Sequence, residues 1–380
     1  MQLTMQNDDG TYDITNMVQS MTLSGDLDSC CRTLEFYTIA SPNDPNLPYV
    51  FIPVGGVLDL YEQGEHIFRG KVEDKSKATD DTAMRVTAFD FGLFLKENEA
   101  TYRFDGETAD AITTTVCTRF GVPIWSLAAP GVPIRRRFNS QPIYKIIDTA
   151  YTLSSEQTGK KYVQRFRGAA LQIVERKETA DILVRPGLNL KRAEYGQSAA
   201  GMVNHVAIID EDGKTVDLVQ DLDAVHQYGM RHREVRQEKD RDAKSEAEAL
   251  LKDNALQNTC SVTILGDARL MTGDTIMLQE PYTGQFGVFW VDGDTHTWSK
   301  GTYETKLTLS YQAEMREGDA GEEEEEDIQR SGGRHEPQSR PDRRVCNRFC
   351  DRTRAFDRAD GRSDLLWGRD HGRTAADRAH

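Results

Sequence analysis

Hydrophobic and polar residues alternate through most of residues 1–104, which is the pattern of strands that bury one face. The alternation predicts five strands, at residues 17–23, 33–39, 54–61, 66–72 and 84–89. The dipeptide Gln63-Gly64 stands between two of these segments and is typical of a tight hairpin turn. The pattern therefore predicts a first, all-β domain over residues 1–104.

The same pattern recurs near residue 280. Four positions correspond in order and without a gap: Gly55 to Gly273, Leu58 to Ile276, Leu60 to Leu278, and Phe68 to Phe286. Each set opens a strand, passes a glycine turn and returns as a second strand, and a third alternating strand follows at 84–89 or 305–311. The repeat predicts a second, similar β domain over residues 191–316.

Residues 105–190 change from a period of two to helical spacing. A helix is expected from Thr108, as the N-cap, to about Phe120, where Gly121 ends it. A second helix is expected after Ser140 as its cap, with Pro142 in its first turn. We interpret this segment as a small α+β domain inserted between the β domains. A further charged helix is expected at 240–258, inside the second β domain.

The 380 residues carry a formal net charge of −15, which is unevenly distributed. Residues 1–327 hold 34 Lys and Arg against 54 Asp and Glu, whereas residues 328–380 hold 13 Arg, no Lys and 8 acids. Apolar residues are sparse beyond residue 317, so the segment 317–380 is predicted to be a disordered, low-complexity tail. A frameshift in a GC-rich gene would also produce such an Arg-rich, Lys-free sequence.

The composition limits the compartment in which the protein folds and the classes of protein to which it can belong. There is no run of about 18 apolar residues and no basic, apolar leader, so neither a membrane span nor a secretory signal is expected. The six cysteines form no CxxC pair and are expected to be free thiols of a protein folded in a cytosol. The acidic body argues against a protein that grips nucleic-acid phosphates.

One group of residues could carry chemistry. Asp292, Asp294 and His296 alternate, so on a regular strand all three would lie on one face, where they could hold a divalent metal. The alternative, which we favour, is a turn at Asp292-Gly293-Asp294 with an exposed histidine beside it. The nucleophile, zinc and phosphate-loop motifs are lacking, so no catalytic residue, cofactor or metal is assigned.

Several segments together resemble a known family. They are residues 55–60, 67–72 and 86–90 in the first half and residues 204–208, 227–229, 261–267, 272–274 and 306–309 in the second. In order and spacing they resemble baseplate hub proteins of the PBSX-prophage type, the XkdQ/YqbQ family, which is related to late control protein D and the T-even phage hub. The resemblance covers roughly residues 1–316 and implies two tail-tube-like β-barrels in each chain.

The resemblance also implies a function. It implies a homotrimer that adapts the six-fold tail tube to the three-fold central spike and forms part of the DNA channel, without catalytic residues. Its partners would be the tail tube protein, the spike or tail-tip protein and other baseplate proteins, with DNA passing through unbound. The protein would lie in the virion tail after assembly in the host cytoplasm. The alternatives are a tail-associated cell-wall hydrolase and a carbohydrate-binding tail-tip protein.

Overall fold

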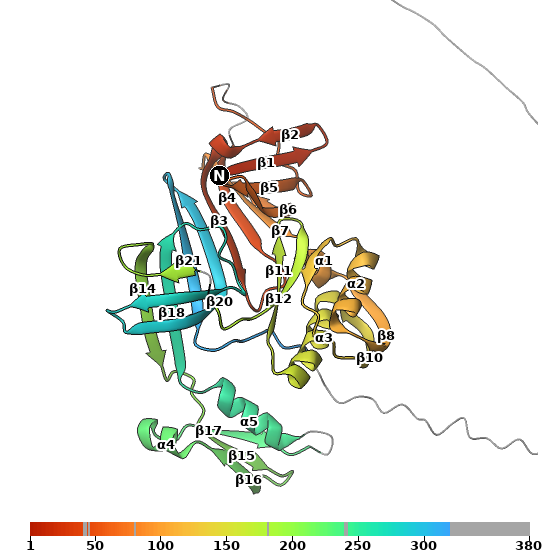
Figure 1. Ribbon diagram of the computed structural model, residues 1–380, viewed down its shortest axis with the longest axis vertical. Coiled ribbons are helices and arrows are strands. Elements are labelled where there is room, and N and C mark those ends of the chain that lie inside the picture. Colours follow the sequence, from red (N-terminus) through yellow and green to blue (C-terminus); the bar gives the residue numbers. More distant parts are fainter. Residues whose placement is uncertain (41–43, 45, 80, 181, 239–241, 320–380) are drawn as a thin grey trace, which may run out of the picture. The chain divides into compact units, whose positions relative to one another are not determined.

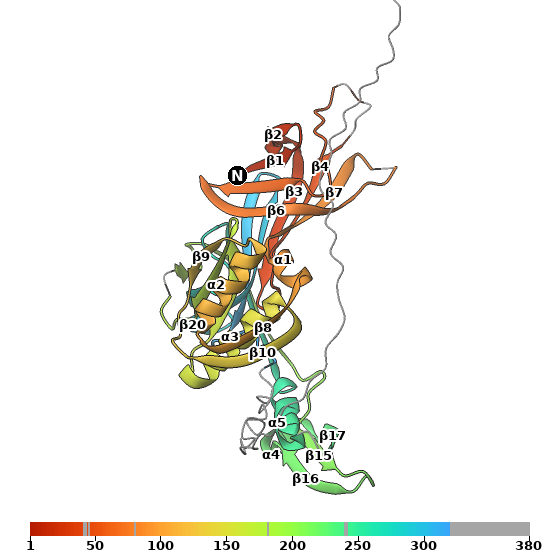
Figure 2. The ribbon, with the colours of Figure 1, turned by 90° about the vertical axis from the view of Figure 1, so that its right-hand side faces the viewer.

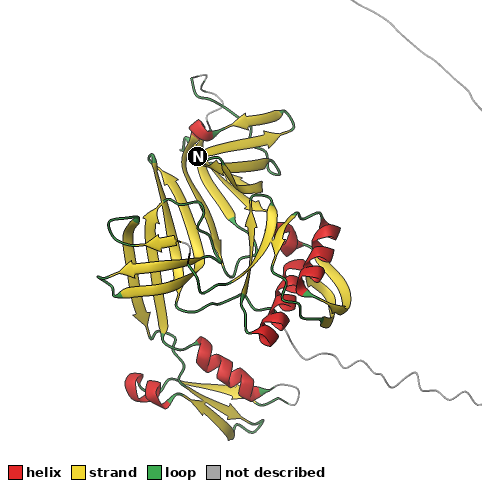
Figure 3. Ribbon diagram, in the orientation of Figure 1, coloured by secondary structure: helices red, strands yellow, loops and turns green. Residues whose placement is uncertain are grey.

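The computed structural model describes residues 1–40, 44, 46–79, 81–180, 182–238 and 242–319 (Figure 1). Strands dominate this part of the chain, and helices accompany smaller sheets (Figure 3). The prediction of a mainly β protein with an α+β insertion is therefore confirmed. Most of the tail predicted to be disordered, residues 320–380, lies outside the described residues.

The first β module is a curled sheet around its own hydrophobic core. Its strands in chain order are β3 (Val18–Asp26), β4 (Thr33–Ile39), β5 (Val57–Glu62), β6 (Glu65–Ser76) and β7 (Ala83–Asp90). In space they follow the order β3-β4-β7-β6-β5, and β1 (Gln2–Asn7) and β2 (Gly10–Asp13) extend the sheet beyond β5. A short 3-10 helix (Thr15–Met17) leads into β3.

The second β module repeats this order. Its strands are β14 (Leu190–Ser198), β18 (Gln257–Leu265), β19 (Thr275–Glu280), β20 (Gln285–Ser299) and β21 (Thr302–Ser310). They are arranged β14-β18-β21-β20-β19, which is the first module's connectivity strand for strand. The short strand β13 (Ile182–Val184) lies parallel to β19. The duplication predicted from four sequence positions is thus present in the topology.

Three of the four repeated positions are equivalent in the structure. Leu58, Leu60, Ile276 and Leu278 are all fully buried, and Gly55 and Gly273 have positive φ angles of 84° and 94°. The fourth position is not equivalent, because Phe68 is 1% exposed and Phe286 is 62% exposed.

A β-bulge explains this difference. In the first hairpin the register shifts between Leu60 and Tyr61, so that Phe68 stands opposite the buried Leu60. The second hairpin has no such shift, and Phe286 stands opposite Gln279 on the outer face. A one-residue change in register moves a side chain to the other face of a sheet.

The two modules are joined into one 13-stranded sheet by the pairing of β3 with β20. One edge of the long strand β20 is shared: residues 285–290 pair with β19, and residues 293–299 pair with β3. The buried side chains of β20 are divided between the two cores. Phe289 and Val291 belong to the second module's core, and Trp298 belongs to the first module's core. A single strand therefore contributes to both cores.

The α+β insertion follows the first module. It comprises α1 (Gly92–Glu97), β8 (Glu99–Glu107), α2 (Ala109–Phe120), β9 (Ile124–Leu127), β10 (Ile134–Pro142), α3 (Ile143–Thr158), β11 (Tyr162–Arg167) and β12 (Ala170–Glu175). Helices α2 and α3 pack beside the β8–β10 ribbon (Figure 2). The proposed boundaries at 104/105 and 190/191 fall at strands, inside β8 and at the first residue of β14.

The predicted helices of the insertion are present, but one start was wrong. Helix α2 begins after Thr108 and ends at Gly121, which has a left-handed φ of 67°. Ser140 does not cap α3, because β10 continues to Pro142 and the helix begins at Ile143 without a side-chain cap. The register of β8 against β10 holds Ser140 in the ribbon, with its N–H donating to Thr101.

A second insertion was not predicted as a separate unit. Residues 199–256, here called the hairpin-tip subdomain, lie between β14 and β18, whose pairing ends at Ser198 and Gln257. The subdomain contains β15 (His205–Ile209), β16 (Thr215–Gln220), α4 (Leu222–Tyr228), β17 (His232–Arg236) and α5 (Ala243–Asp253) around a small core of its own (Figure 1). The helix expected at 240–258 is shorter, because β18 already begins at Gln257.

Residues 311–319, here called the strap, follow β21 and pack on the insertion. Met315 is buried in the insertion's core, and the Arg316 guanidinium forms two hydrogen bonds with the Asp148 carboxylate, at 2.7 and 2.9 Å. Gly318 donates its N–H to Thr152. The three described residues of the predicted disordered tail, 317–319, thus belong to the strap.

No helix in the described ranges is long and apolar enough to cross a membrane.

Candidate functional site: a buried polar junction between the two β modules

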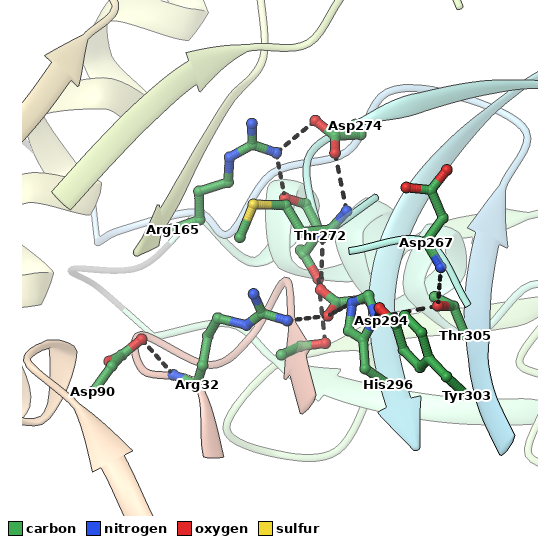
Figure 4. Close-up of polar contacts among 12 residues, drawn as sticks. Arg32, Asp90, Arg165, Asp267, Thr272, Asp274, Asp294, His296, Tyr303 and Thr305 are labelled. Atoms are coloured by element: carbon green, nitrogen blue, oxygen red, sulfur yellow. Dashed lines mark hydrogen bonds and ion pairs between the residues drawn. The ribbon is translucent and has the colours of Figure 1, made fainter. Parts of the chain in front are cut away.

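Asp294 on β20 is the centre of a buried polar cluster (Figure 4). Its carboxylate is 2% exposed and forms an ion pair with the Arg32 guanidinium of the first module. The other oxygen accepts hydrogen bonds from the N–H and the hydroxyl of Thr272, at 2.7 and 2.8 Å. The carboxylate therefore connects residues that stand far apart in the sequence.

The partners of Asp294 keep its carboxyl group ionised. Burial alone would raise the pKa of this carboxyl, but the Arg32 charge and the contact with His296 outweigh burial and lower the pKa to about 2. The group is consequently ionised at neutral pH. A buried carboxylate remains charged only where cations and hydrogen-bond donors replace the lost water.

His296 completes one side of the cluster. Its Nε2 lies 3.2 Å from the Asp294 carboxylate, and its Nδ1 lies 2.9 Å from the Tyr303 hydroxyl and 3.1 Å from the Thr305 hydroxyl. The Tyr303 ring stacks on Trp298 with ring centroids 4.5 Å apart. Both ring nitrogens of His296 are thus engaged inside the protein, where the imidazole is 2% exposed.

Asp90 anchors the backbone beside Arg32. Its carboxyl oxygens accept hydrogen bonds from the N–H groups of Arg32 and Gly92, at 3.0 and 2.9 Å. Burial raises the pKa of Asp90 to about 8. The glycine at 92 is required by the close approach of Cys30, because a Cβ there would lie 2.1 Å from the Cys30 carbonyl oxygen.

Asp292 does not join Asp294 and His296. A register shift between Val291 and Gly293 leaves Asp292 as the extra residue of a bulge. Its carboxylate lies 2.7 Å from the guanidinium of Arg176, which also donates to the Val291 carbonyl at 3.1 Å. Burial lowers the pKa of Arg176.

The candidate face of three ligands, which was the less favoured interpretation, is therefore divided between two arginines. Asp294 and His296 lie together, and Asp292 points to a separate partner. In the part of the chain that the structure describes, no group of three or more His, Cys, Asp and Glu side chains is arranged to hold a metal ion. The preferred alternative, an exposed turn, was wrong as well, because these residues belong to a strand and His296 is buried.

The cluster continues to the α+β insertion through residues that the sequence did not single out as a site. Arg165 on β11 donates to the Asp274 carboxylate at 2.6 Å and to the Thr272 carbonyl at 3.0 Å. Asp274 in turn accepts the N–H of Met271 at 2.9 Å. The loop before β19 thus connects both β modules and the insertion, and no local pattern marks Arg32 or Arg165 for this role.

This cluster connects the two β modules with the α+β insertion. Its carboxyl groups bind arginines and backbone N–H groups, and its histidine is enclosed by aromatic rings and hydroxyls. We call the set Arg32, Asp90, Arg165, Thr272, Asp274, Asp294 and His296 the junction. Its geometry fixes the relative placement of β3, β20 and β11 where the three parts meet.

Comparison with known proteins places the chain in a family. The YQBQ-like family model matches residues 21–310, which is most of the chain. The phage-like element PBSX protein XkdQ of Bacillus subtilis is 23% identical over 299 residues, covering 76% of this chain and 90% of XkdQ. The uncharacterized protein YqbQ of the same organism is 23% identical over 265 residues, covering 67% of this chain and 81% of YqbQ.

A solved structure shows the same fold. The 43 kDa tail protein of prophage MuSo2 from Shewanella oneidensis superimposes with a TM-score of 0.58 at 13% identity, covering 81% of this chain and 97% of that protein. The chain belongs to the YQBQ-like family. The resemblance drawn from the sequence is confirmed, and so is the barrel-like β fold that it implied.

Proposed function

We propose that this protein is a structural component of the baseplate hub in the tail of a phage, a prophage or a phage-tail-like particle. The observation that carries the proposal is the duplicated strand order, β3-β4-β7-β6-β5 and β14-β18-β21-β20-β19, within one continuous sheet. The names of a PBSX relative and of a prophage tail protein with the same fold support a place in a tail.

The duplication suits an adaptor between symmetries. Three copies with two similar modules each present six similar modules around one axis, so a homotrimer can match a six-fold ring on one side and a three-fold object on the other. The tail tube would bind to the six-fold side, and the central spike or tail-tip protein to the three-fold side. Other baseplate proteins would bind around the ring.

The charge of the chain suits a channel for DNA. Residues 1–327 carry 20 more acidic than basic residues, and an acidic wall repels a phosphate backbone. DNA would pass such a wall without binding to it. The protein would lie in the virion tail and would assemble in the host cytoplasm.

The proposed domains have distinct tasks in this arrangement. The β modules, assigned to residues 1–104 and 191–316, would build the ring, and the α+β segment, residues 105–190, would be a spacer and docking surface outside it. The junction supports this assignment of tasks, because it would fix the two β modules of one copy to each other before the copies associate. The pairing of β3 with β20 has the same effect.

A cell-wall hydrolase is the rival that can be tested most sharply. Such an enzyme would need acid–base groups that a substrate can reach. Asp294 and His296 are each 2% exposed and are bonded to other side chains, so they offer no such access. A carbohydrate-binding tail-tip protein is the second rival.

Deleting the reading frame from its phage or prophage tests the proposal and separates it from the rivals. A hub is needed to build the tail, so electron micrographs of induced lysates should show no complete tails. The reintroduced gene should restore them. Complete tails that merely fail to penetrate or adsorb would overturn the hub assignment in favour of a hydrolase or a carbohydrate-binding tip.

A further inference from the structure

Two histidines stand side by side on the hairpin-tip subdomain. His205 on β15 and His232 on β17 are direct partners in the parallel pairing of these strands. Their Nδ1 atoms are 2.8 Å apart, and their ring centroids are separated by 5.0 Å. His205 is half-buried and His232 is exposed, so solvent reaches the pair.

The short separation of the two nitrogens needs a positive atom between them. A neutral imidazole nitrogen that carries no hydrogen presents a lone pair, and two lone pairs facing each other repel. Either one nitrogen carries a hydrogen and donates it to the other, or both lone pairs bind the same cation. Neutral imidazole is a common ligand of transition-metal ions.

We propose that His205 and His232 form a binding site for a divalent transition-metal ion. With metal–nitrogen bonds of about 2.0–2.1 Å, nitrogens 2.8 Å apart subtend an angle of about 86° at the metal. A tetrahedral site would need a separation of about 3.3 Å at the same bond length. The pair therefore suits neighbouring positions of an octahedral or square-planar ion, such as Ni²⁺ or Cu²⁺, better than tetrahedral Zn²⁺.

The surroundings of the pair support this role. The Glu234 carboxylate lies 3.5 Å from Nε2 of His232, the nitrogen opposite the one that faces His205. A carboxylate in this position fixes the ring orientation and makes the other nitrogen a better ligand. Gln220 on β16 stands next to His205 in the pairing and offers an amide oxygen on the same side of the sheet.

The sheet holds both histidines in place from behind. Val206, Ile208 and Val235 are buried against Ala243 and Ala247 of α5, so α5 covers one face of the sheet. The alternation of side chains places His205 and His232 on the opposite face, where His232 is exposed. The pair supplies two ligands, water fills the remaining positions, and the bound ion ties β15 to β17.

Titration of the full chain with Ni²⁺ tests the site. Calorimetry should show one binding event that H205Q and H232Q each weaken about tenfold or more, which corresponds to at least about 1.4 kcal/mol. H226Q is the matched control, because His226 is exposed on α4 in the same subdomain. It should bind Ni²⁺ like the parent protein.

Hydrogen exchange locates the ion. Ni²⁺ should slow amide exchange in residues 205–209 and 232–236 of the parent and of H226Q, but not of H205Q or H232Q. The proposal is overturned if Ni²⁺ leaves the exchange of both strands unchanged, or if H226Q loses as much affinity as H232Q. Tighter binding of Zn²⁺ than of Ni²⁺ at this pair would overturn the assignment of geometry.

Discussion

Arg32 and Asp294 form a buried ion pair between the two β modules, although 262 positions separate them in the sequence. Arg32 precedes β4, and Asp294 lies on the part of β20 that pairs with β3. The pair thus stands where the duplicated units share one sheet. It makes the structure of one module depend on the other, and the predictions below follow from this dependence.

Replacing Asp294 should destabilise the protein strongly. In D294N the Arg32 guanidinium would remain buried without its counter-charge, which typically costs about 3–5 kcal/mol. Chemical denaturation, monitored by tryptophan fluorescence, measures the free energy of unfolding. The matched control is E35Q, which breaks the solvent-exposed pair of Glu35 with Arg85 and should cost much less. Equal losses in both variants would contradict the role of the junction.

The contribution of Asp294 should disappear in acid. Its pKa is about 2 in the folded protein and 3.8 ordinarily, so the unfolded chain takes up the proton first as the pH falls. The stabilisation is complete above about pH 4 and is lost between about pH 4 and pH 2. The difference in unfolding free energy between parent and D294N should therefore shrink in this window. A difference that stays constant from pH 7 to pH 2 would refute the ionised state of Asp294.

The contribution of Asp90 to the free energy of unfolding should have the opposite pH dependence. The folded carboxyl keeps its proton up to about pH 8, whereas the unfolded one releases it near pH 4, so the folded state binds more protons in between. The free energy of unfolding should decrease with rising pH in this window, by at most about 1.4 kcal/mol per pH unit. D90N should lack this component and D294N should retain it. Identical slopes in parent and D90N would show that Asp90 is ionised throughout.

The strap should detach when its ion pair is removed. Asp148 is 7% exposed, and burial raises its pKa while Arg316 lowers it. In R316A the carboxyl loses both of its hydrogen bonds to the guanidinium. Amide exchange in residues 311–319 should become faster, and α3 should lose protection near Asp148. R192A, which removes an arginine paired with Glu194 on the surface, should leave the strap unchanged.

Local sequence patterns predicted the elements whose contacts are local. The turn at Gln63-Gly64 has φ angles of 51° and 85°, as expected for a tight hairpin. Helix α2 begins after Thr108 and ends at Gly121, as its spacing and the glycine predicted. In these cases the residue type decides the conformation of its own neighbourhood.

Long-range pairing was not predictable in the same way. The partner of β3 is β20, where Asp26 stands opposite Gly293, and alternation alone does not name a partner strand. The hairpin-tip subdomain shows the same limit. Its helix α5 was anticipated, but α4 and β17 were not. An insertion at the tip of a β hairpin looks like further strands of the barrel until the pairing of β14 with β18 is known.

The candidate site was misjudged because of one inserted residue. Strict alternation would place Asp292 and Asp294 on one face, but the bulge at Asp292 breaks the alternation. The junction also depends on Arg32 and Arg165, which come from two other parts of the chain. Its members become recognisable only when the strands that carry them are paired.

The solution mass of the full chain tests the central claim most directly. Two modules in each 42.8 kDa chain should associate as three copies, so sedimentation at micromolar concentration should give about 128 kDa. Averaged electron micrographs of the same sample should show a ring with six similar lobes. A mass of one chain at all concentrations, or a ring whose lobes are not six, would contradict the account.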